Sequence, residues 1–524
     1  MFLTEKKKTI FYVVLLSIFS ILINQHYGYQ GINPIDSFFS FNSGYDVLIG
    51  KFPFKDYWTI TGPFIDFIQA FFFKLFGVSW FSYVLHASFF NFIITISTFY
   101  IFYKFKLNSH YCFLYALLVS ILAYPSAGTP YVDHQSSYLS IIGIYCFILA
   151  LNTNLRIYWL LLPIIFGIAF LTKQAPTSHI LLISIFLSAI YFVFNFDLNK
   201  IIFGIIGSLI FLLVFFTVFY IGKISLNSFF HQYILFPLSL GGERLEFLFP
   251  LEFKRIILRF KLLHLSLLIP IIVSIREIIK NYKYLKDKEF LTTLSLIGSS
   301  FALIVHQLMT INGIFIFFII PIFFGFSHIY CLRHFKKNSR YISILLILLS
   351  VISTIYYGNK YIISRHFMDL DKANMKKAIP AEVFDEKLKG LKWITFWNLD
   401  NPQKEISQLK EAIDIIKKDL RKKTIVTDYQ FISVILSVYD NSPSKVWYTR
   451  HVNPVKNNKY FDVYKQFFID KLKENEVEIV YTIKPLWGEY DVLEAILNKN
   501  CIKKVKITEI LESQLLLSCQ ELKK

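Results

Sequence analysis

The sequence predicts a polytopic α-helical membrane protein of about eleven spans that is followed by a C-terminal soluble α/β domain. Of its 524 residues, 55% are hydrophobic and 18% aromatic, whereas only 17% are charged. Apolar segments alternate with short basic runs as far as residue 357, and mixed charged and apolar sequence follows. We therefore expect a transmembrane domain in residues 1–357 and an α/β domain in residues 358–524.

The formal net charge of +19 would favour a nucleic-acid partner in a soluble protein. Here the basic residues lie mainly between apolar segments, where positive charge sets orientation in the membrane, so we expect no nucleic acid. The five cysteines form no CxxC motif and no pairing with histidine at metal-ligand spacing. The sequence therefore indicates no metal and no cofactor.

The first apolar segment follows Lys6, Lys7 and Lys8, and no small-residue cleavage site comes after it. We expect a retained span in a bacterial inner membrane, with the N-terminus in the cytoplasm. An odd number of spans then places the C-terminal domain outside, in the periplasm or at the cell surface. The predicted spans are residues 9–23, 81–103, 111–123, 138–151, 157–171, 179–196, 201–221, 262–275, 291–309, 314–329 and 341–357.

A long loop, residues 24–80, separates the first two spans and faces outward. It carries four aspartates, Asp36, Asp46, Asp56 and Asp66, among glycine, proline and aromatic residues. An aspartate at the bilayer centre costs about 2.5 to 3.5 kcal/mol, so this stretch cannot be a lipid-facing helix. Within it, Pro63–Phe76 is apolar but short, which predicts a helix along the membrane interface. Any one of these aspartates could merely support a turn, but so long and aromatic a loop is typical of function.

Three further polar features are predicted to share this outer face: Asp133 with His134, Lys173 with Gln174, and the segment 222–261. The first pair could instead cap a helix, and Lys173 could extend from a helix end to water. The segment 222–261 contains Arg244 and further basic residues, against the usual bias of outer loops. Either the span count changes by one here, or these cations hold an anion such as a lipid phosphate.

In the C-terminal domain, Asn401-Pro402 predicts the start of a helix that continues to Arg421. The remaining expected elements are strands at Thr424–Thr427, Lys445–Tyr448 and Glu478–Ile483 and a helix at Tyr460–Asn475. Cys501 and Cys519 flank an apparent terminal hairpin, and an outer compartment permits a disulfide. Sequence alone does not decide whether the bond forms, because it does not fix the register.

An acidic group beside cations at an outer membrane surface fits sugar transfer from a polyprenyl-phosphate carrier. Such a transfer needs a base for the acceptor hydroxyl and cations for the departing phosphate. We assign the base to Asp36 and phosphate binding to Lys173, Gln174 and Arg244. The secondary candidates are Asp46, Asp56, His134, His306 and Gln307.

The order of the first span, an early loop aspartate, GKFPFKDYW and GPFIDFIQAFFFKLFG resembles the C superfamily of membrane glycosyltransferases. The similar branch contains bacterial relatives of the protein O-mannosyltransferases and the lipid A aminoarabinose transferases. The resemblance covers roughly the first 180 residues. It implies an inverting transfer in which Asp36 is the catalytic base and Asp133 the second acidic residue. Many relatives have an Asp-Glu pair where this chain has Asp36-Ser37, which leaves Asp46 open as the base.

The predicted reaction moves a sugar from a polyprenyl-phosphate donor to an extracytoplasmic glycan, lipid or protein. Membrane lipids are expected to be further partners. The alternative is a transporter or flippase of lipid-linked sugars that performs no chemistry. A transporter would favour internal repeats and ionisable residues within spans, and the sequence shows no repeat and few such residues. A third hypothesis is a sensory membrane protein that signals through the terminal domain.

Overall fold

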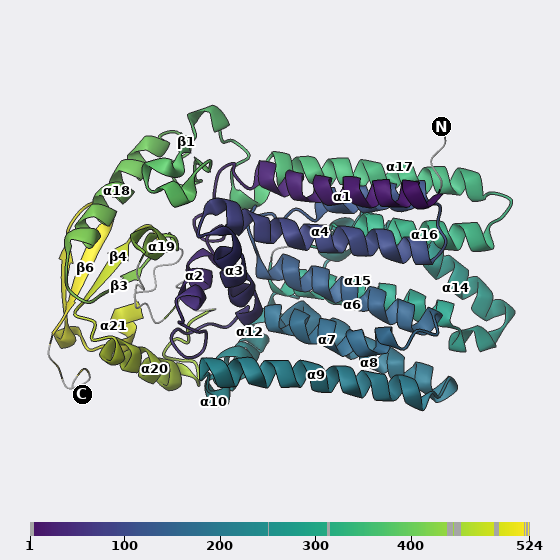
Figure 1. The fold of residues 1–524 in the computed structure, drawn as a ribbon, viewed down its shortest axis with the longest axis horizontal. Coiled ribbons are helices and arrows are strands. Elements are labelled where there is room, and N and C mark those ends of the chain that lie inside the picture. The colour runs from purple at the N-terminus through teal and green to yellow at the C-terminus, as the bar shows by residue number, and fades with distance from the viewer. Residues whose placement is uncertain are drawn as a thin grey trace.

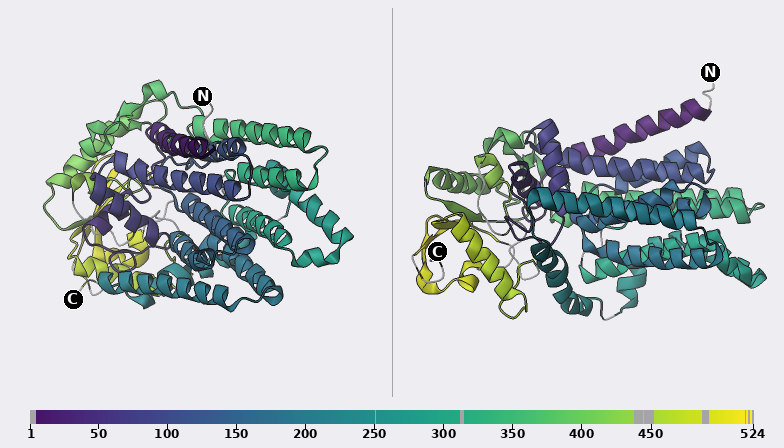
Figure 2. Two further views of the ribbon diagram at one scale, coloured as in Figure 1. Left: turned by 45° about the vertical axis from the view of Figure 1, so that its right-hand side comes forward. Right: turned by 60° about the horizontal axis from the view of Figure 1, so that its bottom comes forward.

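The structure, a computed structural model, describes residues 5–249, 251–311, 315–437, 444, 452–486, 492–517, 519 and 522. Long helices lie side by side in one bundle, and a smaller domain with a β-sheet covers one end of it (Figure 1). The N-terminus lies at the opposite end of the bundle from the sheet (Figure 1). Two further views show the same division (Figure 2). The fold is therefore the predicted one, a polytopic helical protein with a C-terminal α/β domain.

Each predicted span coincides with one or two helices of the bundle. These helices are α1 (Glu5–Tyr27), α4 (Trp80–Lys104), α5 (Ser109–Leu122), α6 (Val132–Asn152), α7 (Ile157–Thr172), α8 (Gln174–Phe194), α9 (Leu198–Gly222), α13 (Lys261–Ser266), α14 (Leu268–Lys280), α15 (Lys288–Met309), α16 (Ile319–His334) and α17 (Ser339–Gly358). Among the described residues, 7 helical segments are long and apolar enough to cross a membrane. The apolar window of α6 is 89% buried and that of α9 only 6%, so α6 lies inside the bundle and α9 faces outward at its edge.

Side chains at the helix starts satisfy the first backbone N–H groups, which have no partner within the helix. Ser79 and Ser82 form a capping box at the start of α4, and Asn108 and Asp287 cap α5 and α15. These local signals explain why α4, α5 and α15 begin within three residues of their predicted starts.

The outer loop folds into two helices, α2 (Phe41–Leu48) and α3 (Pro63–Phe76), and α3 lies across the end of the bundle (Figure 1). The bounds of α3 agree with the prediction. Gly62, at its N-cap, has a φ of +51°, and an added Cβ would lie 2.8 Å from Ile65 and 3.0 Å from Val132. A residue other than glycine would therefore strain this entry to the helix.

The segment 222–261 forms short helices at the same end of the bundle as α2 and α3 (Figure 1). They are α10 (Leu226–Phe229), η1 (Phe230–Leu235), α11 (Phe236–Ser239), α12 (Gly241–Glu246) and η2 (Lys254–Leu258). The span count does not change here, so the basic residues of this segment lie at the same end as Asp36.

The terminal domain contains a four-stranded sheet in the order β3-β4-β6-β5. Its strands are β3 (Lys423–Val426), β4 (Ile479–Ile483), β5 (Ile502–Lys506) and β6 (Leu511–Leu516), and its helices are α18 (Pro402–Lys418), α19 (Ile432–Leu436), α20 (Phe461–Glu474) and α21 (Val492–Ile496). β3 is parallel to β4, and the other pairs are antiparallel. The strand predicted at Lys445–Tyr448 lies outside the described residues.

Short elements connect α17 to the sheet and link the remaining segments. They are η3 (Tyr282–Lys286), η4 (Asn359–Ile363), η5 (His366–Met368), η6 (Met375–Lys377), β1 (Ile379–Pro380), η7 (Ala381–Val383), η8 (Glu386–Leu388), β2 (Lys392–Trp393) and η9 (Lys499–Cys501). β5 and β6 form the expected terminal hairpin, and a disulfide joins Cys501 to Cys519 across a Cα–Cα distance of 5.4 Å. The structure thus decides the question that the sequence left open.

The outer loop and the terminal domain share one hydrophobic core. Phe38 lies with its ring centroid 4.8 Å from that of Phe431 and 6.1 Å from that of Trp393. Asn42 of α2 donates a hydrogen bond of 3.0 Å to Gln430. Because these side chains are buried together, the loop that carries Asp36 is held by the terminal domain as well as by the bundle.

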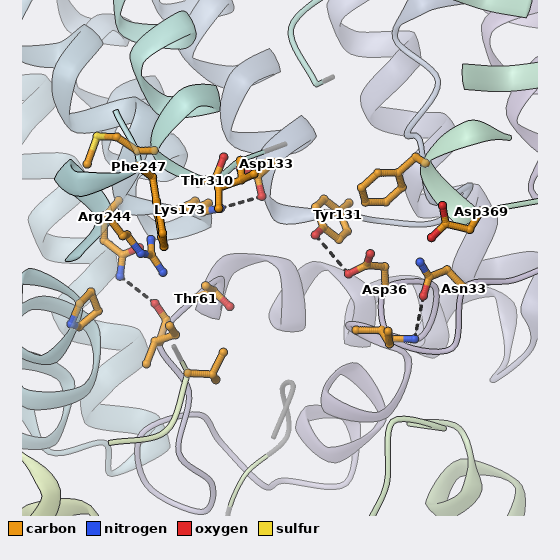
Figure 3. Close-up of a pocket in the computed structure, with 18 of the residues that line it drawn as sticks. Asn33, Asp36, Thr61, Tyr131, Asp133, Lys173, Arg244, Phe247, Thr310 and Asp369 are labelled. Atoms are coloured by element: carbon orange, nitrogen blue, oxygen red, sulfur yellow. Dashed lines mark hydrogen bonds and ion pairs between the residues drawn. The ribbon is translucent and has the colours of Figure 1, made fainter. Parts of the chain in front are cut away.

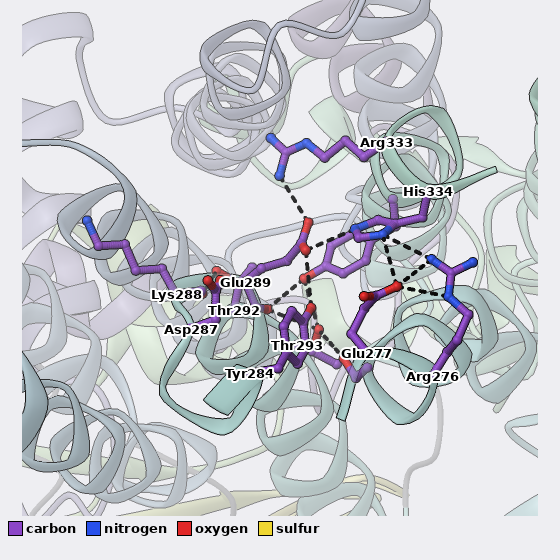
Figure 4. Close-up of polar contacts among 12 residues, drawn as sticks. Arg276, Glu277, Tyr284, Asp287, Lys288, Glu289, Thr292, Thr293, Arg333 and His334 are labelled. Carbon is purple, nitrogen blue, oxygen red and sulfur yellow. Dashed lines mark hydrogen bonds and ion pairs between the residues drawn. The ribbon is translucent and has the colours of Figure 1, made fainter. Parts of the chain in front are cut away.

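At the opposite end of the bundle, a polar cluster joins α14, α15 and α16 (Figure 4). Glu289 accepts hydrogen bonds from Arg333 at 3.2 Å and Tyr284 at 3.1 Å, and its other contact is with His334 Nε2 at 2.9 Å. Glu277 pairs with Arg276 at 2.7 Å. These contacts fix the helix ends remote from the sheet.

Candidate active site

A cavity of about 420 Å³ lies where the bundle meets the outer loop and the terminal domain. Its polar lining includes Asn33, Asp36, Thr61, Asp133, Lys173, Gln174, Arg244, Thr310 and Asp369 (Figure 3). The predicted catalytic and phosphate-binding residues thus line one cavity, although Asp36 and Arg244 are more than two hundred residues apart in the sequence.

Asp36 lies in the turn between α1 and α2, where its backbone N–H donates to the carbonyl of Asn33 at 3.1 Å. Tyr131 donates a hydrogen bond to Asp36 Oδ1 at 3.2 Å. Burial raises the pKa of Asp36 to about 7, and the charge of Asp133 acts in the same direction, whereas the bond from Tyr131 opposes it. A carboxyl with this pKa can both accept and release a proton near neutral pH, as a general base must.

Tyr131 comes directly before α6, and aromatic rings hold it in place. Its ring centroid lies 5.3 Å from that of Phe315, 6.0 Å from that of Phe39 and 6.1 Å from that of Phe367. Burial raises the pKa of Tyr131 well above its usual value, so its hydroxyl stays a donor. The sequence did not identify Tyr131 as a site residue.

Asp133 lies in the first turn of α6 and binds two cationic or ionisable partners. Lys173 Nζ lies 2.6 Å from its Oδ2, and His306 Nε2 lies 2.6 Å from its Oδ1. Both carboxylate oxygens are therefore occupied. Since Asp133 is only 2% exposed, this buried carboxylate needs such partners and fixes the Lys173 ammonium at the cavity wall.

Arg244, on α12, lines the cavity beside Lys173 (Figure 3). In the part of the chain that the structure describes, its guanidinium makes no hydrogen bond and no ion pair. Burial lowers the pKa of Arg244, but guanidinium groups remain charged in proteins. The site therefore presents a cation whose donors are available to an anion.

Gln174 also lines the cavity, but its side-chain amide nitrogen is already used. It donates to the carbonyls of Ile60 at 2.8 Å and Tyr233 at 2.6 Å. These bonds hold the outer loop and the segment 222–261 against the start of α8. The amide N–H groups that would bind a phosphate are thus committed to the backbone.

Of the secondary candidates, His306 contacts Asp133, which lines the cavity. The other four are Asp46, Asp56, His134 and Gln307, and they do not line the cavity. Asp46 is buried within α2, and Asp56 accepts from the backbone N–H of Phe52 at 2.8 Å. His134 accepts from the N–H of Ser126 at 3.3 Å, and Gln307 from that of Phe315 at 3.1 Å. Asp56, His134 and Gln307 thus each accept a hydrogen bond from a backbone N–H group. Within the described residues, no group of His, Cys, Asp and Glu is arranged to hold a metal ion.

Residues 61–221 match the model of a family described as dolichyl-phosphate-mannose-protein mannosyltransferase. The predicted family resemblance is confirmed over this segment. The match includes Asp133, Lys173 and Gln174 and begins after Asp36. The segment that contains the bundle helices α4 to α8 is thus similar in sequence to this family.

Two solved structures are similar over 96% of this chain and 97% of their own. They are crystal structures of ArnT from Cupriavidus metallidurans. One, bound to undecaprenyl phosphate, is 9% identical with a TM-score of 0.45. The other, in the apo state, is 10% identical with a TM-score of 0.44. No curated protein matches the chain.

Proposed function

We propose that the protein is a membrane glycosyltransferase that moves a sugar from a polyprenyl-phosphate carrier to an acceptor outside the cytoplasm. The observation that carries the proposal is one cavity that combines Asp36, ionisable near neutral pH, with the cations Lys173 and Arg244. The match of residues 61–221 to a family named for a lipid-phosphate sugar donor supports the same chemistry. The site would act at the outer face of a bacterial inner membrane.

In this mechanism, the acceptor hydroxyl attacks the anomeric carbon of the sugar as Asp36 takes its proton. The bond from that carbon to the phosphate oxygen breaks, and the carrier phosphate leaves with the electron pair. Lys173 and Arg244 stabilise the negative charge that develops on it. Attack from the side opposite the phosphate gives inversion of configuration.

Asp133 acts as a positioning residue in this proposal. Because its two oxygens hold Lys173 and His306, it keeps the lysine ammonium at the cavity wall and balances its charge. It is not available to accept the acceptor proton. The roles of the two carboxylates thus differ because, among the described residues, the side chain of Asp36 has one partner at 3.2 Å and that of Asp133 has two at 2.6 Å.

Asp36→Asn tests the assignment, because asparagine keeps the shape of the side chain but cannot accept the proton. We expect transfer from a polyprenyl-phosphate sugar in membrane vesicles to fall by about 10²- to 10⁴-fold, with unchanged protein level. Asp56→Asn is the matched control, since Asp56 belongs to the same loop and does not line the cavity. Full activity of Asp36→Asn would exclude Asp36 as the base. A transporter would move the carrier and form no covalent product.

A further inference from the structure

A second pocket, of about 530 Å³, adjoins the cavity and shares Ile311 and Phe367 with it. We call it the basic pocket; it is formed by the η2–α13 junction, the end of α17, η4 and η5. Its lining residues are Leu258, Arg259, Lys261, Ile311, Phe317, Tyr356, Tyr357, Lys360, Tyr361, His366 and Phe367.

The charge of the basic pocket differs from that of the cavity. The cavity lining contains the carboxylates Asp36, Asp133 and Asp369, whereas the described lining of the basic pocket contains none. Lys261 and Lys360 form no ion pair with any described residue. Asp371 contacts His366 at 2.8 Å but does not itself line the pocket. The positive charges of Lys261 and Lys360 repel each other, so binding of an anion between them is favourable.

One wall of the basic pocket is a stack of aromatic rings. Phe317 and Tyr357 stack with centroids 3.7 Å apart and planes at 11°, and Phe317 and Tyr361 with centroids 5.8 Å apart and planes at 14°. Lys360 Nζ lies 5.3 Å from the centre of the Tyr361 ring. Aromatic rings and basic side chains at the end of a membrane-spanning helix are typical of the lipid headgroup region.

The apolar residues at the rim of the basic pocket favour a lipid over a free ion. Leu258 is 49% exposed and Tyr356 is 55% exposed. Tyr356 belongs to the helical segment Ser339–Met368, which is apolar and long enough to cross a membrane, and Leu258 lines the same pocket. A phosphate held by the cations would thus continue into acyl chains that lie along this apolar surface.

We propose that the basic pocket binds the phosphate headgroup of an anionic lipid, at a site separate from that of the sugar donor. The proposal does not depend on the sugar-transfer chemistry. A lipid seated here covers Phe367, whose ring contacts Tyr131, the hydrogen-bond donor to Asp36. The bound headgroup would therefore complete one wall of the candidate active site.

The test uses the purified full chain in phosphatidylcholine nanodiscs, with fluorescent phosphatidic acid as the probe. Arg259→Gln with Lys261→Gln should weaken binding about tenfold or more, because each basic residue near a membrane surface contributes substantially to anion affinity. Lys360→Gln tests the opposite wall independently and should also weaken binding. The matched control, Lys223→Gln with Lys254→Gln, removes equal charge at the same end of the molecule and should leave binding unchanged.

The probes separate lipid from free phosphate. Diacylglycerol with the same chains should not bind, and inorganic phosphate should bind far more weakly than phosphatidic acid. Equal losses in the pocket and control variants would overturn the proposal, because binding would then reflect only the general surface charge. The proposal would also be overturned if inorganic phosphate bound as tightly as phosphatidic acid. Loss of transfer in Asp36→Asn with intact phosphatidic acid binding would show that the two proposals stand independently.

Discussion

At Asp36, burial and one hydrogen bond act in opposite directions on the same carboxyl group. Burial raises the pKa of Asp36 to about 7, and the hydrogen bond from Tyr131 lowers it. A base must be ionised to accept a proton, so the proposed transfer should become faster as pH rises through about 7. Burial thus raises the pH that Asp36 needs in order to act as a base, and the hydrogen bond from Tyr131 lowers that pH.

Tyr131→Phe removes that hydrogen bond and keeps the ring in its aromatic surroundings. The pKa of Asp36 should rise further, so the acidic limb of the kcat/KM profile should move to higher pH. Activity should recover as the medium becomes alkaline, which a general loss of structure would not permit. The measurement is transfer rate against pH for both proteins. An acidic limb at the same pH in both would contradict the role of Tyr131.

The sequence could identify Asp36, Asp133, Lys173 and Arg244, because span alternation alone places them at one end of the bundle. It could not show which histidine reaches Asp133. His134 is adjacent in sequence, but neighbouring helical residues point in different directions, and it bonds instead to Ser126. His306 reaches Asp133 from α15, a contact that depends on how two distant helices pack.

At the scale of helices and strands, the predicted bounds are correct where glycine or proline marks the ends of the element. Gly62-Pro63 and Gly77 enclose α3, and its predicted bounds hold. α6 begins at Val132, earlier than the predicted Tyr138, because the polar residues of its first turns are typical of a loop. These turns are buried against other helices and do not face lipid, so polar residues are tolerated there.

Glu289→Gln tests the polar cluster that joins α14, α15 and α16. The change weakens the contacts with Arg333 and His334, and since Glu289 is only 16% exposed, we expect a loss of about 1 to 3 kcal/mol of stability. The thermal unfolding midpoint in detergent should fall, with transfer activity at permissive temperature unchanged. Glu5→Gln is the control, because Glu5 forms an exposed pair with Lys8 that contributes little. Equal midpoints for the two variants would contradict this role.

For the whole molecule, the N-terminus and the sheet lie at opposite ends of the bundle (Figure 1). If the basic residues orient the protein as predicted, Lys389→Cys on the terminal domain should react with a membrane-impermeant maleimide in cells whose outer membrane is permeabilised. Lys283→Cys, at the other end, should react only after lysis. The native cysteines give little background, because Cys501 and Cys519 are bonded and the other three are buried. The reverse labelling pattern would contradict the orientation.

The division of the chain at residue 358 can be read from composition, but the contact between its parts cannot. Phe38 and Phe431 are far apart in sequence, and no local pattern in either segment indicates that their rings meet. The same applies to Asn42 and Gln430. Only the folded chain shows that the loop with Asp36 is built partly on the terminal domain. Whether the terminal domain is a separate unit stays a prediction.

This shared core has a consequence for how the protein is made. Synthesis proceeds from the N-terminus, so the ribosome delivers Phe38 and Asp36 long before Trp393 and Phe431. Until those later residues have been synthesised, the early loop lacks the surface against which it packs. A nascent chain, or one that ends before these residues, would thus be inserted in the bilayer with its candidate active site unfinished.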